Sequence, residues 1–311
     1  MRKITIDFNK SFKKVLAVYA VIFIAGIIAA MPFAFGVSFD INFSGGTKIS
    51  YSYTGDIAEK DIEDTVKGVI DNSFTVSQST ALAGDTKTFE ISLAGKNAIS
   101  AEQQEELSTA LNEKFKDNEI AIYNSNSVNP TIAGTFFAKS LVAILITALL
   151  VVIYVGIRFR RIGGISAAIT ALVALVFDVL ITFFTCVFFR LQIDSNYIAV
   201  VLTILGYSLN DTIVIYDRIR ENERLEPNKE IGEIVNSSIN MVTKRNVVTS
   251  VTTFLAVVTI VVVSELFGLS SLRTFAVPMA FGIVSGAVSS LFISGPLWVI
   301  WKRHKAKKAA K

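Results

Sequence analysis

The chain has 311 residues, of which 52% are hydrophobic and 18% are charged, against about 25% charged residues in ordinary soluble domains. This composition excludes a disordered chain, a fibrous protein and most cytosolic enzymes, and it favours a polytopic α-helical protein embedded in a lipid bilayer. The net charge of +4 gives no reason to expect nucleic acid binding. The chain has one cysteine, Cys186, and one histidine, His304, so there is no reason to expect a disulfide framework, a metal site or an enzyme.

Six stretches approach the length of about 20 apolar residues that a membrane-spanning helix requires. They are Val15–Phe35, Leu141–Ile157, Ile165–Phe189, Tyr197–Tyr216, Val247–Ser264 and Phe275–Trp301. The second stretch is short, and we expect its helix to begin nearer Ala133. A signal peptide is the alternative for the first stretch, although its apolar run exceeds the usual length of about 7–15 residues.

These spans divide the chain into four parts. Residues 1–35 form a short basic terminus with the first span, residues 36–139 a large insert, residues 140–301 spans two to six, and residues 302–311 a basic tail. Basic residues are concentrated at both termini and in the loops after the second and fourth spans, whereas each short loop on the other side holds one, Arg190 or Arg273. Because basic loops remain in the cytoplasm, we expect both termini there and the insert outside.

The insert has the pattern of an α+β domain. It contains 8 Lys and no Arg against 15 Asp and Glu. The expected order is strand Thr47–Tyr53, helix Ile57–Ile70, strand Thr75–Leu82, strand Lys87–Leu93, helix Ala101–Phe115 and strand Ile120–Val128. This βαββαβ order is that of a ferredoxin-like domain. Its acidic surface indicates a solvated face, with binding of an extended polypeptide at a sheet edge as the second interpretation.

Two carboxylates lie inside predicted spans, where ionisable groups are costly and often functional. Asp178 has apolar neighbours on both sides, whereas Asp211 follows Asn210 in an unusually polar stretch. Either carboxyl is a candidate for taking up and releasing a proton. The alternative is a structural carboxyl that hydrogen-bonds to a neighbouring helix.

Arg245, at the head of the fifth span, is the candidate counter-charge for Asp211. Both residues lie 17 positions from Asn228 in the connection between spans four and five, so a symmetric hairpin places them at one depth. A separate surface helix over Ile231–Met241 would break this symmetry. In the alternative interpretation, Arg245 is an ordinary cytoplasmic anchor.

Small residues in the last span predict close helix packing. Gly282, Gly286, Ser289 and Ser290 form one small-residue face, a pattern common in membrane helix bundles.

One motif carries a resemblance to a known family. Residues 206–214, with the sequence GYSLNDTIV, continue into DRIREN at 217–222 and resemble the fourth-span signature of SecF proteins in the SecD/SecF family of the RND superfamily. Phe43–Thr47 resembles the family's glycine pair before the external domain. Asn42, Asn129 and Phe177 depart from the Asp, Gly and His that the family usually has there.

The resemblance implies an auxiliary subunit of bacterial protein export in the inner membrane. It implies that the chain pairs with SecD and works with the SecYEG channel on a preprotein substrate, driven by the proton gradient or, alternatively, by sodium. Asp211 and Arg245 are then the main ion-coupling residues, with Asp178 and Asn210 as weaker candidates. Two other functions stay open: a half-transporter for a small hydrophobic solute, and a structural membrane scaffold.

Overall fold

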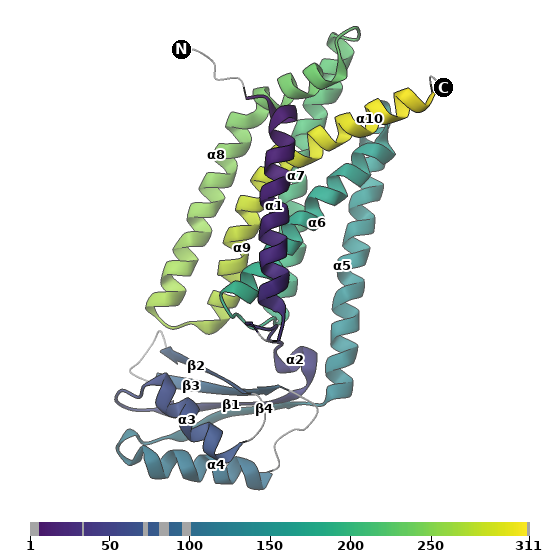
Figure 1. The fold of residues 1–311 in the computed structure, drawn as a ribbon. Helices are drawn as coiled ribbons and strands as arrows, with labels where there is room; N and C mark the ends of the chain where they lie inside the picture. Colours follow the sequence, from purple (N-terminus) through teal and green to yellow (C-terminus); the bar gives the residue numbers. More distant parts are fainter. Residues whose placement is uncertain (1–5, 33, 71–73, 81–86, 95–100, 310–311) are drawn as a thin grey trace.

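A bundle of long apolar helices carries a small sheet domain at one end, and both ends of the chain lie at the other (Figure 1). The computed structural model describes residues 6–32, 34–70, 74–80, 87–94 and 101–309. The predicted fold class, a helical membrane protein with a sheet domain, is confirmed.

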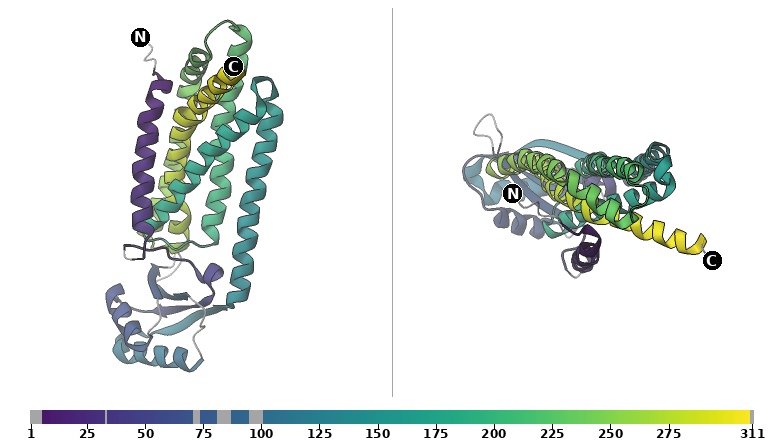
Figure 2. Two further views of the ribbon diagram at one scale, coloured as in Figure 1. Left: turned by 45° about the vertical axis from the view of Figure 1, so that its right-hand side comes forward. Right: turned by 90° about the horizontal axis from the view of Figure 1, so that it is seen from above.

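Within the described residues, six helical segments are long and apolar enough to cross a membrane. They are α1 (Phe8–Ala30), α5 (Pro130–Arg158), α6 (Gly164–Phe188), α7 (Ser195–Leu225), α8 (Ile231–Leu266) and a composite last segment. The last consists of α9 (Ser270–Ser289), a π-helical turn η3 (Ser290–Ser294) and α10 (Gly295–Ala309). Figure 2 shows α10 projecting sideways from the bundle.

Several helices begin earlier than their apolar runs because polar caps precede them. Asn129 accepts a hydrogen bond from the backbone N–H of Thr131, and Pro130 occupies the first turn, so α5 begins at Pro130 rather than near Ala133. Glu230 caps α8 in the same way through the N–H groups of Gly232 and Glu233. The stretch Ile231–Met241 is therefore the first part of α8 and not a separate surface helix.

The sheet domain has the predicted ferredoxin-like topology. Its elements are β1 (Gly46–Tyr53), α3 (Glu59–Val69), β2 (Phe74–Thr80), β3 (Lys87–Ala94), α4 (Ala101–Lys114), a 3₁₀ turn η1 (Lys116–Asn118) and β4 (Ala121–Val128). The strand order is β2-β3-β1-β4 with antiparallel neighbours, so each βαβ unit holds a strand of the other between its own two. The end predicted for the second strand, residues 81–82, lies outside the described residues.

One face of the sheet packs on its two helices. The alternating residues Ile49 and Tyr51 of β1 and Phe89 and Ile91 of β3 are fully buried in a core that both helices complete. β4 is the last strand in the sheet order, so the edge that does not face β1 is free among the described strands, and seven of its eight residues are exposed. The free edge of β4 therefore presents unpaired backbone groups to its surroundings.

A short linker attaches the sheet domain to the bundle. The backbone of Asp40 donates to the carbonyl of Ile193, and Ile193 donates to the carbonyl of Ser38, so the linker pairs with the loop before α7. The helix α2 (Ile41–Ser44) follows and packs on the start of α5. Gly45 adopts φ 75°, and a Cβ there would lie 2.8 Å from Cα of Pro130, so the turn requires glycine.

Candidate ion-coupling site

Asp178 is the centre of a polar cluster inside the bundle. Its side chain is 0% exposed and accepts three hydroxyl hydrogen bonds, from Ser208 at 2.6 Å, Ser285 at 2.6 Å and Ser289 at 2.9 Å. Tyr19 of α1 reaches the same place and donates to the carbonyl of Ser285 at 3.1 Å. The Asp178 carboxyl therefore joins α6, α7 and α9, and Ser285 extends the cluster to α1.

The polar contacts between α7 and the last segment continue toward the chain termini. Thr212 bonds to Ser290 at 3.1 Å, and Ser290 also donates to the carbonyl of Ser208 at 3.2 Å. One turn further, the Tyr216 hydroxyl lies 2.8 Å from that of Thr170 and donates to the carbonyl of Ser294. Ser290 and Ser294 bound the π-helical turn, a feature that is frequent at functional sites.

The small residues of α9 allow this close approach. A Cβ at Gly286 would lie 3.0 Å from Cβ of Ser208, and one at Gly282 would lie 2.7 Å from a methyl carbon of Thr182. The face formed by Gly282, Gly286, Ser289 and Ser290 thus packs against α6 and α7. It also supplies two of the hydroxyl groups described above.

Asp211 lies apart from this cluster, on the side of α7 that meets α8. It is 3% exposed, and Ser250 of α8 donates a hydrogen bond to it at 3.3 Å. The ion pairs of the described residues include none between Asp211 and Arg245. The predicted counter-charge, Arg245, thus forms no ion pair with Asp211 among the described residues, and the hydrogen-bond partner at the depth of Asp211 is Ser250.

The register of the α7–α8 hairpin explains this difference. Asn222 bonds to Ser238 at 2.8 Å, which centres the hairpin near Glu230 instead of Asn228. Arg245 precedes Ser250 by five residues on α8. Its Cα atom therefore lies about 7.5 Å along the helix axis from that of Ser250, on the side of the chain termini.

An open cavity of about 1090 Å³ lies beside the α7–α8 hairpin, at the end of the bundle that holds the chain termini. Asn210 and Arg245 line it beside Val214, so the chain neighbour of Asp211 and the predicted counter-charge face the same space. Arg161, Arg218, Arg220 and Arg224 also line it, together with Asp217, Glu221 and Glu223. The cavity thus reaches Asn210, the residue before Asp211, whereas the buried Asp211 does not line it.

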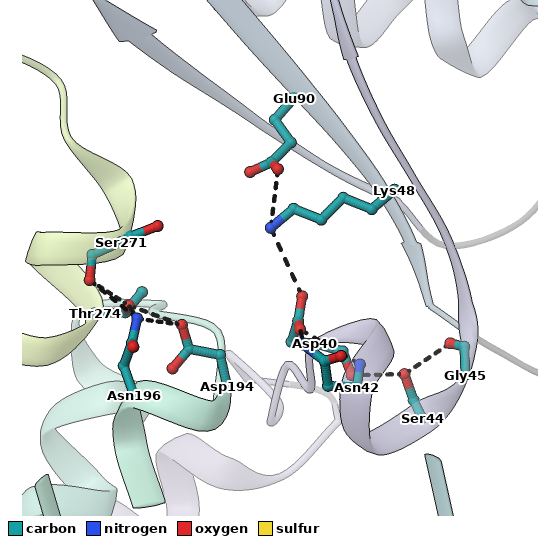
Figure 3. A network of polar contacts seen from close by, with 10 residues as sticks. All are labelled: Asp40, Asn42, Ser44, Gly45, Lys48, Glu90, Asp194, Asn196, Ser271 and Thr274. Carbon is teal, nitrogen blue, oxygen red and sulfur yellow. Dashed lines mark hydrogen bonds and ion pairs between the residues drawn. The ribbon is translucent and has the colours of Figure 1, made fainter. Parts of the chain in front are cut away.

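A second polar region lies where the sheet domain meets the bundle (Figure 3). Asp194 caps α7 and accepts hydrogen bonds from Asn196 at 3.0 Å and from Thr274 of α9 at 2.9 Å. Nearby, Lys48 of β1 lies 2.9 Å from Glu90 and 3.9 Å from Asp40 of the linker. Hydrogen bonds therefore join the first residues of α7 and α9 next to the segment that carries the sheet domain.

Burial raises the pKa of the Asp194 carboxyl. The hydrogen bonds from Thr274 and from the backbone of Tyr197 oppose this rise, and the negative charge of Asp40 adds to it.

The structure shows side chains that the sequence did not single out. Ser208 lies inside the motif at 206–214 and Ser285 between two glycines of the small-residue face, but neither position indicated a hydrogen bond to Asp178. Tyr19 lies in an ordinary apolar run and gives no signal in the sequence. No group of three or more His, Cys, Asp or Glu residues able to hold a metal occurs in the part of the chain that the structure describes.

Comparisons with known proteins agree with this architecture. Residues 107–304 match the family model for the C-terminal part of the protein export membrane proteins SecD/SecF. The chain is 31% identical over 291 residues to protein translocase subunit SecF of Alicyclobacillus acidocaldarius, covering 93% of this chain and 90% of that protein. With SecF of Borreliella burgdorferi the identity is 32% over 310 residues, covering 96% and 99%.

Longer relatives contain a segment like this chain within a larger protein. Protein translocase subunit SecDF of Bacillus subtilis is 30% identical over 308 residues, which cover 97% of this chain and 39% of that protein. The crystal structure of SecDF from Thermus thermophilus, a translocon-associated membrane protein, has a TM-score of 0.78 at 28% identity and covers 96% of this chain and 39% of that one. The family model and the SecF relatives of similar length show that this chain belongs to the SecD/SecF family of protein export membrane proteins.

Proposed function

We propose that this chain is an auxiliary subunit of the bacterial Sec machinery, in which proton movement past Asp211 promotes preprotein translocation on the outer side of the inner membrane. The observation that carries this proposal is the buried carboxyl of Asp211, which accepts a hydrogen bond from Ser250 and directly follows a residue that lines an open cavity, in a protein export family member. Such a carboxyl exchanges protons without an added cofactor.

The partner in this proposal is SecD, which would supply the matching six spans beside the SecYEG channel. The SecDF relatives support it because they contain a segment like this chain within one longer polypeptide. Large apolar side chains also cover the outside of α5, among them Leu145 and Leu149, each more than half exposed. The basic residues at both termini favour a cytoplasmic location for them.

The coupling step is a change of charge at Asp211. When ionised, its carboxylate is attracted to Arg245 in the cavity and accepts the hydrogen bond from Ser250. A proton removes the charge and weakens both interactions, so that α7 and α8 favour another relative position. A charge that crosses 100 mV supplies about 2.3 kcal/mol, enough for a substantial shift of such an equilibrium.

The junction offers a route for this shift to the sheet domain. The helix that carries Asp211 is capped by Asp194, which accepts a hydrogen bond from Thr274 of α9. The same loop pairs through Ile193 with the linker before β1. A displacement of α7 therefore acts on the attachment of the domain, and a moving domain can prevent an emerging preprotein from sliding back.

Preprotein export into inverted membrane vesicles tests the proposal. We expect the wild type to lose stimulation when the proton gradient is collapsed, and Asp211→Asn to lack stimulation with the gradient present. The control is Glu226→Gln, an exposed carboxylate in the α7–α8 connection, which should export like the wild type. Stimulation by the gradient that persists in Asp211→Asn would contradict the proposal, and a sodium gradient in place of the proton gradient identifies the ion.

The same variants separate the two alternatives. A half-transporter for a small hydrophobic solute predicts that Asp211→Asn changes drug sensitivity and leaves export unchanged. A structural scaffold predicts that Asp211→Asn and Arg245→Ala both export normally whenever the complex assembles.

A further inference from the structure

Asn246 is buried in α8 without a hydrogen-bond partner. Its side chain is 1% exposed, and neither its Oδ1 nor its Nδ2 atom has a partner among the residues that the structure describes. A buried polar group without a partner costs about 1–3 kcal/mol, and native proteins usually satisfy such groups with an internal water molecule. The Asn246 amide has N–H donors and an oxygen acceptor, so it is well suited to hold a water molecule.

Asn246 lies next to the proposed coupling carboxyl. It precedes Ser250 by four residues on α8, so the two side chains share a helix face and their Cβ atoms are about 5–6 Å apart. Ser250 donates to Asp211 at 3.3 Å. Because helix side chains lean toward the N-terminus, the Asn246 amide extends from this contact toward the end of the bundle that holds the chain termini.

The cavity opens at the same end. Arg245, the chain neighbour of Asn246, and Asn210, the chain neighbour of Asp211, both line the open space of about 1090 Å³. Asn246 and Asp211 do not line the cavity themselves, but each directly follows a residue that does. The unpaired Asn246 amide therefore lies one helix turn from Ser250, on the side of the Asp211–Ser250 contact that faces the chain termini.

On the other side of Asp211 the surroundings are different. Tyr207 precedes Asp211 by four residues on α7, and its hydroxyl is also buried without a partner among the described residues. It packs against an apolar cluster with Phe254, Ile260 and Met279. Tyr207 lies one turn from Asp211 toward the sheet domain, on the side away from the cavity, so it provides a matched case of an unpaired polar group outside the proposed route.

We propose that Asn246 holds a water molecule that carries protons between Asp211 and the cavity. The Nδ2 group donates to the water oxygen and Oδ1 accepts from one of its hydrogens, so the amide keeps its own protonation state. When Asp211 releases its proton, the carboxyl O–H bond breaks, the water accepts the proton and passes another to the water in the cavity. Asn246 is therefore a positioning residue. This inference rests on the proposed role of Asp211, and it adds the path by which that carboxyl exchanges its proton.

The test measures proton exchange at Asp211 itself, without export. Infrared spectroscopy of the full chain in lipid nanodiscs at acidic pH gives the C=O band of the protonated carboxyl, assigned by its loss in Asp211→Asn. Transfer into D₂O then gives the exchange rate of that proton. We expect Asn246→Leu to slow the exchange about 100-fold, the lower end of the effect of a positioned proton-transfer group.

Two variants serve as controls. Asn246→Ser keeps a hydroxyl and room for water and should exchange at the wild-type rate. Tyr207→Phe removes an unpaired polar group away from the cavity and should do the same. If Asn246→Leu does not fold, Asn246→Val replaces it as the apolar variant.

Wild-type exchange in the apolar variant would overturn the inference. Equal slowing in Asn246→Ser or in Tyr207→Phe would also overturn it, because the effect would then be structural. The exchange rate is independent of preprotein. A failure of the proposed export role would therefore appear in the vesicle assay, and a failure of this path would appear only here.

Discussion

Asp178 and Asp211, the two buried carboxyls of the predicted spans, have different surroundings. Asp178 accepts three serine hydroxyls and holds α6, α7 and α9 together, whereas Asp211 has one serine partner and stands beside the cavity. The sequence predicted both as unusual because ionisable residues are costly inside membrane spans. It did not predict their partners, since serine and threonine in helices bond equally well to a carbonyl four residues earlier.

Ser285→Ala tests the role of Asp178 as a packing centre. We expect a loss of about 0.6–1.7 kcal/mol in the free energy of unfolding, the range of hydrogen bonds between membrane helices. Unfolding in mixed detergent and lipid micelles measures it. Thr259→Ala, which removes an exposed hydroxyl of α8, is the control, and equal losses in the two variants would show that the cluster contributes no stability.

Asp194→Asn tests the electrostatics of the junction. Because burial raises the pKa of Asp194 in the folded chain, the folded state retains a proton that the unfolded state loses as the pH rises above about 3.9. Stability should therefore fall with increasing pH between that value and the raised pKa. The variant keeps a good helix cap and should lack this fall. Thermal unfolding of both proteins from pH 3 to pH 7 measures the difference, and parallel profiles would refute the expectation.

At the scale of helices and strands, the sequence predicted which elements exist better than how neighbouring helices align with each other. The apolar runs located the spans, and alternation located the strands. The fifth predicted span does not include the first turns of α8, because they contain polar residues. In the structure, Glu230 caps one continuous helix that includes them. The pairing of Asn222 with Ser238 shifts the hairpin and moves Arg245 away from Asp211. Such a register depends on side-chain packing between helices, which periodicity does not contain.

Gly282→Ala tests the close contact of α9 with its neighbours. The added Cβ would lie 2.7 Å from Thr182 and 2.8 Å from Ile204, so we expect a loss of about 1–3 kcal/mol through overpacking. The matched control is Gly206→Ala in α7, where a Cβ meets nothing within 4 Å and the better helix propensity should stabilise the chain slightly. Chemical unfolding of both variants measures this, and a neutral Gly282→Ala would mean that the interface yields.

At the scale of the whole molecule, the linker before β1 and the loop before α7 form a junction between the sheet domain and the helix bundle, two parts that the sequence predicted separately. Residues 38–40 and the loop at 191–194 show no motif, yet their backbones pair and join the sheet domain to the start of α7. Asp40, Lys48 and Glu90 continue this connection into β1 and β3. The central claim is that a proton at Asp211 changes the position of the domain through this junction.

A distance measurement across the junction tests that claim most directly. Spin labels at Lys60→Cys in α3 and Leu266→Cys at the end of α8, in a Cys186→Ala background, report the separation of domain and bundle in nanodiscs. We expect acidification to shift the distance distribution of the wild type, and Asp211→Asn to show the acidic distribution at every pH. The same pH response with and without Asp211 would contradict it.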